Sequence, residues 1–206
     1  YIAAGCGMTV NVSTLENGIR VVTESMPRVE TVSCGVWVGT GARNETADVN
    51  GVAHLLEHMA FKGTERRSAQ DIVEEIESVG GHLNAYTSRE QTAYYAKVLK
   101  ENTGLALDLL SDILQNSTFD AEELERERAV VIQEIGQAHD TPDDLIFDHF
   151  QTVAFPDQPL GRPVLGSVET VGNMPRETIM GHMSAGYGGD RMVLSAAGNL
   201  EHDAFV

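Results

Sequence analysis

The sequence predicts an α+β fold in which helices pack on one mostly antiparallel sheet, giving a two-layer domain. Two observations predict it. Several β-rich runs are joined by connections too short to hold a crossover helix, and the first connection carries Asn17-Gly18. Between these runs lie segments whose apolar residues recur at helical spacing, as over 103–115.

The first part of the chain is predicted to form strands. Residues 9–24 alternate around Asn17-Gly18, the strongest short hairpin signal, with β-rich residues on both sides. Residues 32–38 form another β-rich run, followed by the loop 39–50, which is rich in Gly, Asn, Asp and Thr. This loop leads the chain into a helix.

Two helices are expected next. Residues 51–62 contain good helix formers and no proline, and Gly63 stands where a glycine often ends a helix. Ser68 and Asp71 resemble a capping box with Asp in place of Glu, and apolar residues then continue at helical spacing to Gly80. The first of these helices contains the chemical motif described below.

The rest of the chain continues the mixed pattern. Residues 82–86 and 92–99 are expected to pair as a second hairpin, and the leucines on one side of 103–115 predict an amphipathic helix. The remaining expected elements are a charged helix capped by Asp120 and running to about 138, a helix from Pro142 to about 153, a loop over 155–166, a helix over 176–185, a strand over 191–197 and the start of another helix within 198–206.

Composition limits the possible functions. The chain has 206 residues, of which 42% are hydrophobic, and a formal net charge of −17, so it can build a core but repels nucleic-acid phosphates. No apolar run reaches the roughly 18 residues of a membrane span. A basic peptide would suit this charge, although acidity also serves solubility alone. The two cysteines, Cys6 and Cys34, exclude a disulfide framework, and Cys34 is expected to be buried.

The segment His54-Leu-Leu-Glu-His58 carries the strongest chemical signal. Helical residues four apart project about 40° apart, so both imidazoles can bind one metal ion. Glu57 lies within the same arc, where its carboxylate can accept a proton from metal-bound water. The order HxxEH is that of the inverted class of zinc hydrolases. Two ordinary histidines beside a surface glutamate are the alternative reading of this pentapeptide alone.

A catalytic zinc ion needs a third protein ligand. The helix expected over 120–138 offers Glu122, Glu123, Glu125, Glu127 and Glu134. Glu134 stands in an apolar stretch, where a partly buried carboxylate needs a partner. Glu127 lies two turns earlier on nearly the same face and could orient a ligating histidine or the catalytic water. The other three glutamates and the remaining histidines are expected to be structural or solvent-exposed.

Three segments resemble the pitrilysin-type zinc peptidases, or inverzincins, and among them the mitochondrial processing peptidases and their bacterial relatives. These segments are 54–64, 83–92 and 125–134, and they occur in the family order over nearly the whole chain. The resemblance implies the processing-peptidase-like metallohydrolase fold. It also implies a zinc-dependent metalloendopeptidase that holds one Zn²⁺ per chain.

The resemblance implies roles for individual residues. It assigns His54, His58 and Glu134 as zinc ligands, Glu57 as the general base and Glu127 as a supporting carboxylate. The residues that it places against an extended peptide are Phe61, Asn84, Ala85, Tyr86, Asp144 and Asp148. Phe61 would receive the side chain just after the scissile bond, and the strand at 84–86 would pair with the substrate. The two aspartates would meet a substrate arginine, although the resemblance implies Glu rather than Asp at position 144.

Family members work with a second, similarly folded half, so we expect one zinc-binding domain over 1–206 followed by further chain, or a dimer with a homologous subunit. Residues 1–7 would then be upstream or tag sequence, with Met8 as a candidate native start. A non-catalytic scaffold of the same fold is the alternative function. The expected location is the bacterial cytoplasm, with the mitochondrial matrix as the alternative.

Overall fold

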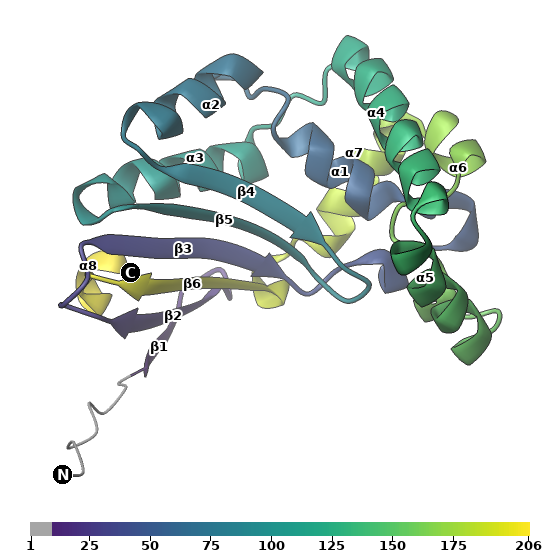
Figure 1. The fold of residues 1–206 in the computed structure, drawn as a ribbon. Helices are drawn as coiled ribbons and strands as arrows, with labels where there is room; N and C mark the ends of the chain where they lie inside the picture. Colours follow the sequence, from purple (N-terminus) through teal and green to yellow (C-terminus); the bar gives the residue numbers. More distant parts are fainter. Residues whose placement is uncertain (1–9) are drawn as a thin grey trace.

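The computed structural model describes residues 10–206, and the expectations for residues 1–7, Met8 and Cys6 lie outside them. A six-stranded sheet forms one layer, with the strand order β1-β2-β6-β3-β5-β4 (Figure 1). The strands are β1 (Val10–Thr14), β2 (Arg20–Ser25), β3 (Thr31–Val38), β4 (His82–Thr87), β5 (Thr92–Leu99) and β6 (Met192–Gly198). All neighbours are antiparallel except β2 and β6, so the predicted α+β fold is confirmed.

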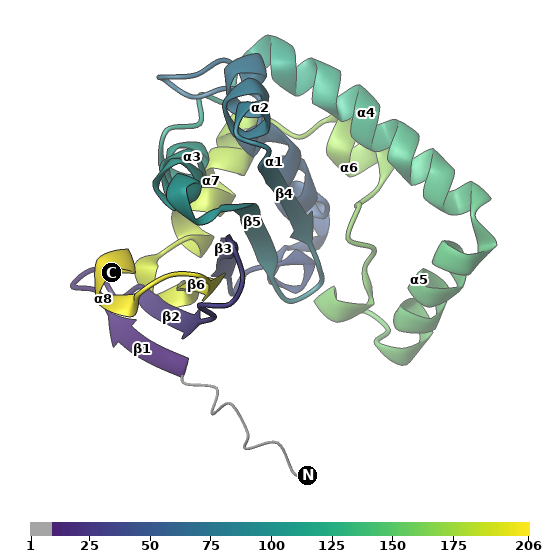
Figure 2. The ribbon, with the colours of Figure 1, turned by 60° about the vertical axis from the view of Figure 1, so that its left-hand side comes forward.

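The helices of the described residues form the second layer and extend beyond it. They are α1 (Val52–Ala60), α2 (Ala69–Ser78), α3 (Thr103–Gln115), α4 (Ala121–Asp140), α5 (Pro142–Ala154), α6 (Val168–Gly172), α7 (Arg176–Gly186) and α8 (His202–Phe205). None of them is both long and apolar enough to cross a membrane. Figure 2 shows α2, α3, α1 and α7 beside the sheet, and α4, α5 and α6 farther out.

Both predicted hairpins are confirmed. β1 pairs with β2 in register across the turn at Asn17-Gly18, where Gly18 has a φ of 91° that favours glycine. β4 pairs with β5 in the same antiparallel way, from His82 opposite Lys97 to Thr87 opposite Thr92. Among the strands of residues 10–206, β4 stands last in the sheet order and is therefore an edge strand.

The core lies on one face of the sheet. Cys34 stands opposite Ala96 on β5 and Ala196 on β6, so alternation along the strands turns all three toward α3. Cys34 is buried, as expected, and its thiol pKa is raised to about 11 by burial. A second apolar cluster joins α1 to α4, α6 and α7 through residues such as Leu55 and Val131. Together the two clusters fix α1 between the sheet and α4.

Some boundaries differ from the expectations. α4 continues to Asp140 rather than ending near 138, because the predicted stop had no capping signal of its own. The helix α6 was not predicted: it has only five residues and is capped by Ser167, whose hydroxyl accepts from the Thr170 N–H at 3.1 Å. The parallel pairing of β2 with β6 was also not foreseen, since it joins opposite ends of the described chain.

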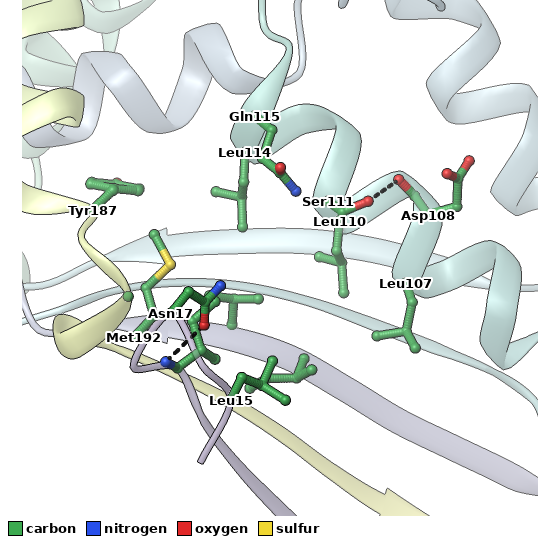
Figure 3. Close-up of a pocket in the computed structure, with 14 residues that line it drawn as sticks. Leu15, Asn17, Leu107, Asp108, Leu110, Ser111, Leu114, Gln115, Tyr187 and Met192 are labelled. Atoms are coloured by element: carbon green, nitrogen blue, oxygen red, sulfur yellow. Dashed lines mark hydrogen bonds between the residues drawn. The ribbon is translucent and has the colours of Figure 1, made fainter. Parts of the chain in front are cut away.

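A cavity of about 530 Å³ lies between α3 and the sheet (Figure 3). Its walls are mainly apolar side chains of α3 and of the strands, joined by Leu15 of the turn after β1 and by Tyr187 just after α7. Asn17, Asp108, Ser111 and Gln115 supply polar groups. This cavity shares no lining residue with the smaller recess beside Glu57 and His58.

Candidate metal centre

Helix α1 presents the motif because its other side is buried. Leu55, Leu56 and Met59 are fully buried, and burial of such a side chain contributes about 1.5–3 kcal/mol. His54, Glu57 and His58 are only partly buried and fall at i, i+3 and i+4, on one stripe of the helix. The packing that holds α1 in place therefore also orients its three functional side chains.

The start of α1 is held by the buried carboxylate of Glu45, which lies outside the motif His54–His58. Glu45 is 3% exposed, and its Oε1 accepts from the Ala53 N–H at 2.8 Å. Its Oε2 accepts from the Gly51 N–H and from Asn50 Nδ2, both at 2.8 Å. Glu45 thus takes up backbone donors that a helix leaves unpaired at its N-terminus.

Three donor atoms converge between α1 and α4. Glu134 Oε2 lies 3.6 Å from His54 Nε2 and 3.5 Å from His58 Nε2. One ligand atom of each residue lies within 4.8 Å of the other two. In a tetrahedral site with bonds of about 2.0–2.2 Å, ligand atoms stand roughly 3.3–3.6 Å apart, so this set fits a zinc ion.

The protonation of His54 suits metal binding. Burial, together with the nearby His58, lowers the pKa of His54 to about 4. Its imidazole is therefore neutral at physiological pH and keeps a lone pair for a metal ion. The same residue's Nδ1 is buried without a hydrogen-bond partner among the described residues.

The surroundings of Glu57 make its carboxylate more basic than usual. Burial raises the pKa of its carboxyl, and the negative charge of Glu134 acts in the same direction. Its Oε2 is buried and has no hydrogen-bond partner among the described residues. A carboxylate with a raised pKa and a free oxygen is a stronger base than an ordinary surface glutamate.

Glu127 supports one of the two histidines. It is buried on α4, and its Oε2 lies 2.9 Å from His58 Nδ1. A proton on Nδ1 donated to Glu127 leaves His58 Nε2 free to face Glu134. The other oxygen, Oε1, lies 2.8 Å from Lys62 Nζ. The sequence left open whether Glu127 would orient a ligating histidine or the catalytic water; its carboxylate contacts His58, and the contact with Lys62 was not predicted.

The edge strand β4 closes the site on one side. A recess of about 190 Å³ is lined by Glu57, His58, Phe61, Lys62, Asn84, Ala85 and Glu127. Ala85 N–H donates to the side-chain oxygen of Asn84 at 2.8 Å. Phe61 packs with Tyr94 at a ring separation of 6.2 Å, and Tyr86, which is 38% exposed, does not line the recess. Of the four residues proposed for this side of the substrate, the structure brings three to the recess.

Asp144 and Asp148 on α5 differ in their contacts. Asp148 Oδ1 accepts from Arg89 Nη2 at 2.6 Å, whereas no ion pair joins Asp144 to Arg89 within residues 10–206. Arg89 belongs to the turn between β4 and β5. The chain's own arginine thus engages Asp148, and the expectation that both aspartates meet one substrate arginine stays a prediction.

Three residues that contact the site or its supports were not predicted from the sequence. Lys62 had a local signal, since it stands four residues after His58, but its partner Glu127 lies on another helix. Glu45 and Arg89 had no local signal, because each acts on a separate segment. Charged residues of this kind are usually solvated, so only the folded chain reveals their partners.

A family model covers most of the chain. The model described as "Insulinase (Peptidase family M16)" matches residues 20–168, which is more than half of the chain, so the chain belongs to the peptidase family M16. The match contains α1 and α4, and hence His54, His58 and Glu134. The family expected from the motif and its flanking segments is confirmed.

Curated relatives include zinc proteases and a processing peptidase. The chain is 48% identical over 195 residues to a probable mitochondrial-processing peptidase subunit beta of Arabidopsis thaliana, covering 95% of this chain and 37% of that protein. It is 45% identical over 193 residues to an uncharacterized zinc protease of Bacillus subtilis, covering 94% of this chain and 47% of that protein. The chain therefore spans less than half the length of these relatives.

Solved structures share the fold at lower identity. A protease from Helicobacter pylori superposes with a TM-score of 0.92 at 24% identity, covering 96% of this chain and 48% of that one. A peptidase M16 inactive domain from Pseudomonas fluorescens superposes with a TM-score of 0.89 at 15% identity, covering 96% and 48%. Since an inactive domain has the same fold, activity has to be argued from the site residues.

Proposed function

We propose that the chain is the zinc-binding part of a metalloendopeptidase that cleaves extended peptides. The observation that carries this proposal is the convergence of His54 Nε2, His58 Nε2 and Glu134 Oε2, with Glu57 on the same stripe of α1. His54, His58 and Glu134 would hold one zinc ion. That ion would supply a Lewis acid and lower the pKa of a bound water toward about 7.

The chain's own residues would divide the remaining work. Glu57 would accept the proton of the attacking water and return it to the leaving amine, because its raised pKa suits both steps. Glu127 would keep His58 oriented through the contact at Nδ1. These two residues are the proposed catalytic and supporting carboxylates.

The substrate would add to the sheet as a further strand. β4 is an edge strand, and Asn84 and Ala85 line the recess beside Glu57. Main-chain pairing of this kind binds many sequences. Asn84 would have to release the Ala85 N–H when a peptide pairs there. Phe61 would contact the side chain that follows the scissile bond, and Tyr86 would contact the peptide farther along the strand.

A preference for basic peptides rests on charge. The net charge of −17 and the exposed Asp144 favour an arginine or lysine in the substrate. Asp148 would join Asp144 only after exchanging Arg89 for the substrate's guanidinium, and such bidentate contacts are strong. We therefore propose a moderate preference for basic residues.

The proposed enzyme needs a second, homologous half or subunit. The relatives are at least twice as long as the matched segment, and α5 exposes Ile146, Phe147, Phe150 and Val153, which are 60–80% exposed. Apolar side chains this exposed are typical of a surface that a partner covers. The bacterial cytoplasm is the proposed location and the mitochondrial matrix the alternative, since relatives include bacterial proteases and a mitochondrial peptidase subunit.

The test is hydrolysis of a quenched fluorescent peptide that contains arginine, by the zinc-loaded chain alone and mixed with the second half of the Bacillus subtilis relative. Glu57→Gln should retain zinc and lower turnover by at least about 100-fold, the low end of a general base's contribution. Turnover that survives this substitution would remove Glu57 from the role of base. Zinc binding without turnover under either condition would favour the non-catalytic scaffold.

A further inference from the structure

Lys62 follows Phe61, the residue that caps the end of α1, and begins the loop that leads to α2. Its Nζ is 2.8 Å from Glu127 Oε1, while Glu127 Oε2 is 2.9 Å from His58 Nδ1. One carboxylate thus joins the ammonium group to the imidazole, using a different oxygen for each partner.

The contact between Lys62 and Glu127 matters because the side chain of Glu127 is buried. Its side chain is 7% exposed, whereas that of Lys62 is 31% exposed. A buried carboxylate is costly unless it is paired, and removing its partner leaves an uncompensated charge. With a partner on each oxygen, the carboxylate cannot turn without breaking one contact.

Within residues 10–206, Lys62 is the lysine or arginine that pairs with Glu127. The two arginines nearest in sequence, Arg126 and Arg128, are engaged with Glu122, Glu123 and Glu125 along the same helix. Cations are also scarce, at 14 lysines and arginines against 31 acidic residues. Among residues 10–206, therefore, Arg126 and Arg128 are already paired with other glutamates, and only Lys62 forms an ion pair of a lysine or arginine with Glu127.

We propose that Lys62 is a positioning residue of the metal centre. By holding Glu127 Oε1, it fixes Oε2 against His58 Nδ1 and so keeps His58 Nε2 directed toward Glu134 and the metal position. This inference rests on the proposed zinc-dependent function, and it adds Lys62 as a determinant of how tightly zinc is held. Lys62 acts through Glu127 and does not itself bind the metal.

The test measures the zinc dissociation constant of the purified chain by competition with a chromophoric chelator. Lys62→Met removes the charge and keeps the length, and it should raise Kd about tenfold, the low end of the roughly 10–100-fold cost of losing a supporting contact. Lys62→Arg restores a donor and should return Kd close to that of the unsubstituted chain. Lys100→Met, which removes an exposed pair with Glu30, is the matched control and should leave Kd unchanged.

A second comparison distinguishes an effect of Lys62 through Glu127 from a general effect of losing its charge. In a chain that already carries Glu127→Gln, Lys62→Met should cause little further loss, because residues that act through one contact are not additive. A Lys62→Met chain with unchanged Kd, or with the same fold-loss in both backgrounds, would overturn the inference. Absence of zinc binding by the unsubstituted chain would instead overturn the proposed function, and this inference with it.

Discussion

At the scale of single residues, burial shifts the pKa values of two neighbouring side chains of the site in opposite directions. His54 is neutral because burial lowers its pKa to about 4, while Glu57, three residues later, has a carboxyl pKa that burial raises. One residue is thereby ready to donate a lone pair and the other to accept a proton. The same burial gives opposite shifts because one acid is cationic and the other neutral when protonated.

Removal of Glu134 should abolish tight metal binding. Glu134→Ala leaves two imidazoles without the oxygen that faces both of them, so zinc affinity should fall by more than about 100-fold, beyond the cost of a lost supporting contact. Chelator competition measures the change. Glu122→Ala, at an exposed position of the same helix, should have no effect, and an unaltered affinity in Glu134→Ala would reject this residue as a ligand.

At the scale of elements, α1 is anchored at both ends by side chains from elsewhere. Glu45 holds its N-terminus, and Ser117 Oγ donates to the carbonyl of Ala60 at 3.0 Å near its C-terminus. The helix has only nine residues, too few to be stable alone in water. Its position, and therefore the spacing of the motif, depends on these tertiary contacts.

Loss of the Glu45 contacts should loosen α1. Glu45→Ala leaves the buried N–H groups of Gly51 and Ala53 without this acceptor, so the free energy of unfolding should fall by about 2–4 kcal/mol, from two lost hydrogen bonds with unpaired donors. Urea unfolding measures this loss. Glu16→Ala, at an exposed position in the first hairpin turn, should change it little; an equal loss in both variants would refute the capping role.

Local signals predicted most elements. The hairpin at Asn17-Gly18 and the cap at Ser68 are encoded within a few residues, and both are present in the structure. The pairing of β2 with β6 and the contact of Lys62 with Glu127 join distant segments, so periodicity and capping rules do not reach them. Two residues of the candidate metal centre, His54 and His58, were predictable because they lie in one pentapeptide. Glu134 was predictable because it stands in an apolar stretch within the family-like segment 125–134.

At the scale of the molecule, a buried ionic network ties the segment after α1 to α3. Asp112 is fully buried and accepts from Thr64 at 2.8 Å, Arg66 at 3.1 Å and Arg67 at 2.8 Å. Burial alone would raise the pKa of its carboxyl, but the hydrogen bonds from Arg67, Asn116, Thr64 and Arg66 outweigh burial and hold the pKa well below its usual range. Folding therefore favours the ionised carboxylate.

This network should make the free energy of unfolding depend on pH. Because the folded pKa is depressed, the stabilisation is complete above the unfolded value of about 3.9 and is lost as the pH falls through and below it. Asp112→Asn should lower the unfolding free energy at pH 7 by about 3–5 kcal/mol and weaken its decline in acid. Urea unfolding at several pH values measures both effects; a decline as steep as in the unsubstituted chain would contradict the assignment to Asp112.

Metal content of the purified chain, measured by elemental mass spectrometry, tests the central claim most directly, with His58→Ala as the paired variant. The convergence of His54, His58 and Glu134 predicts close to one zinc per chain, lost in the variant. Absence of zinc after reconstitution, or equal zinc in both chains, would contradict a metal centre at these three residues.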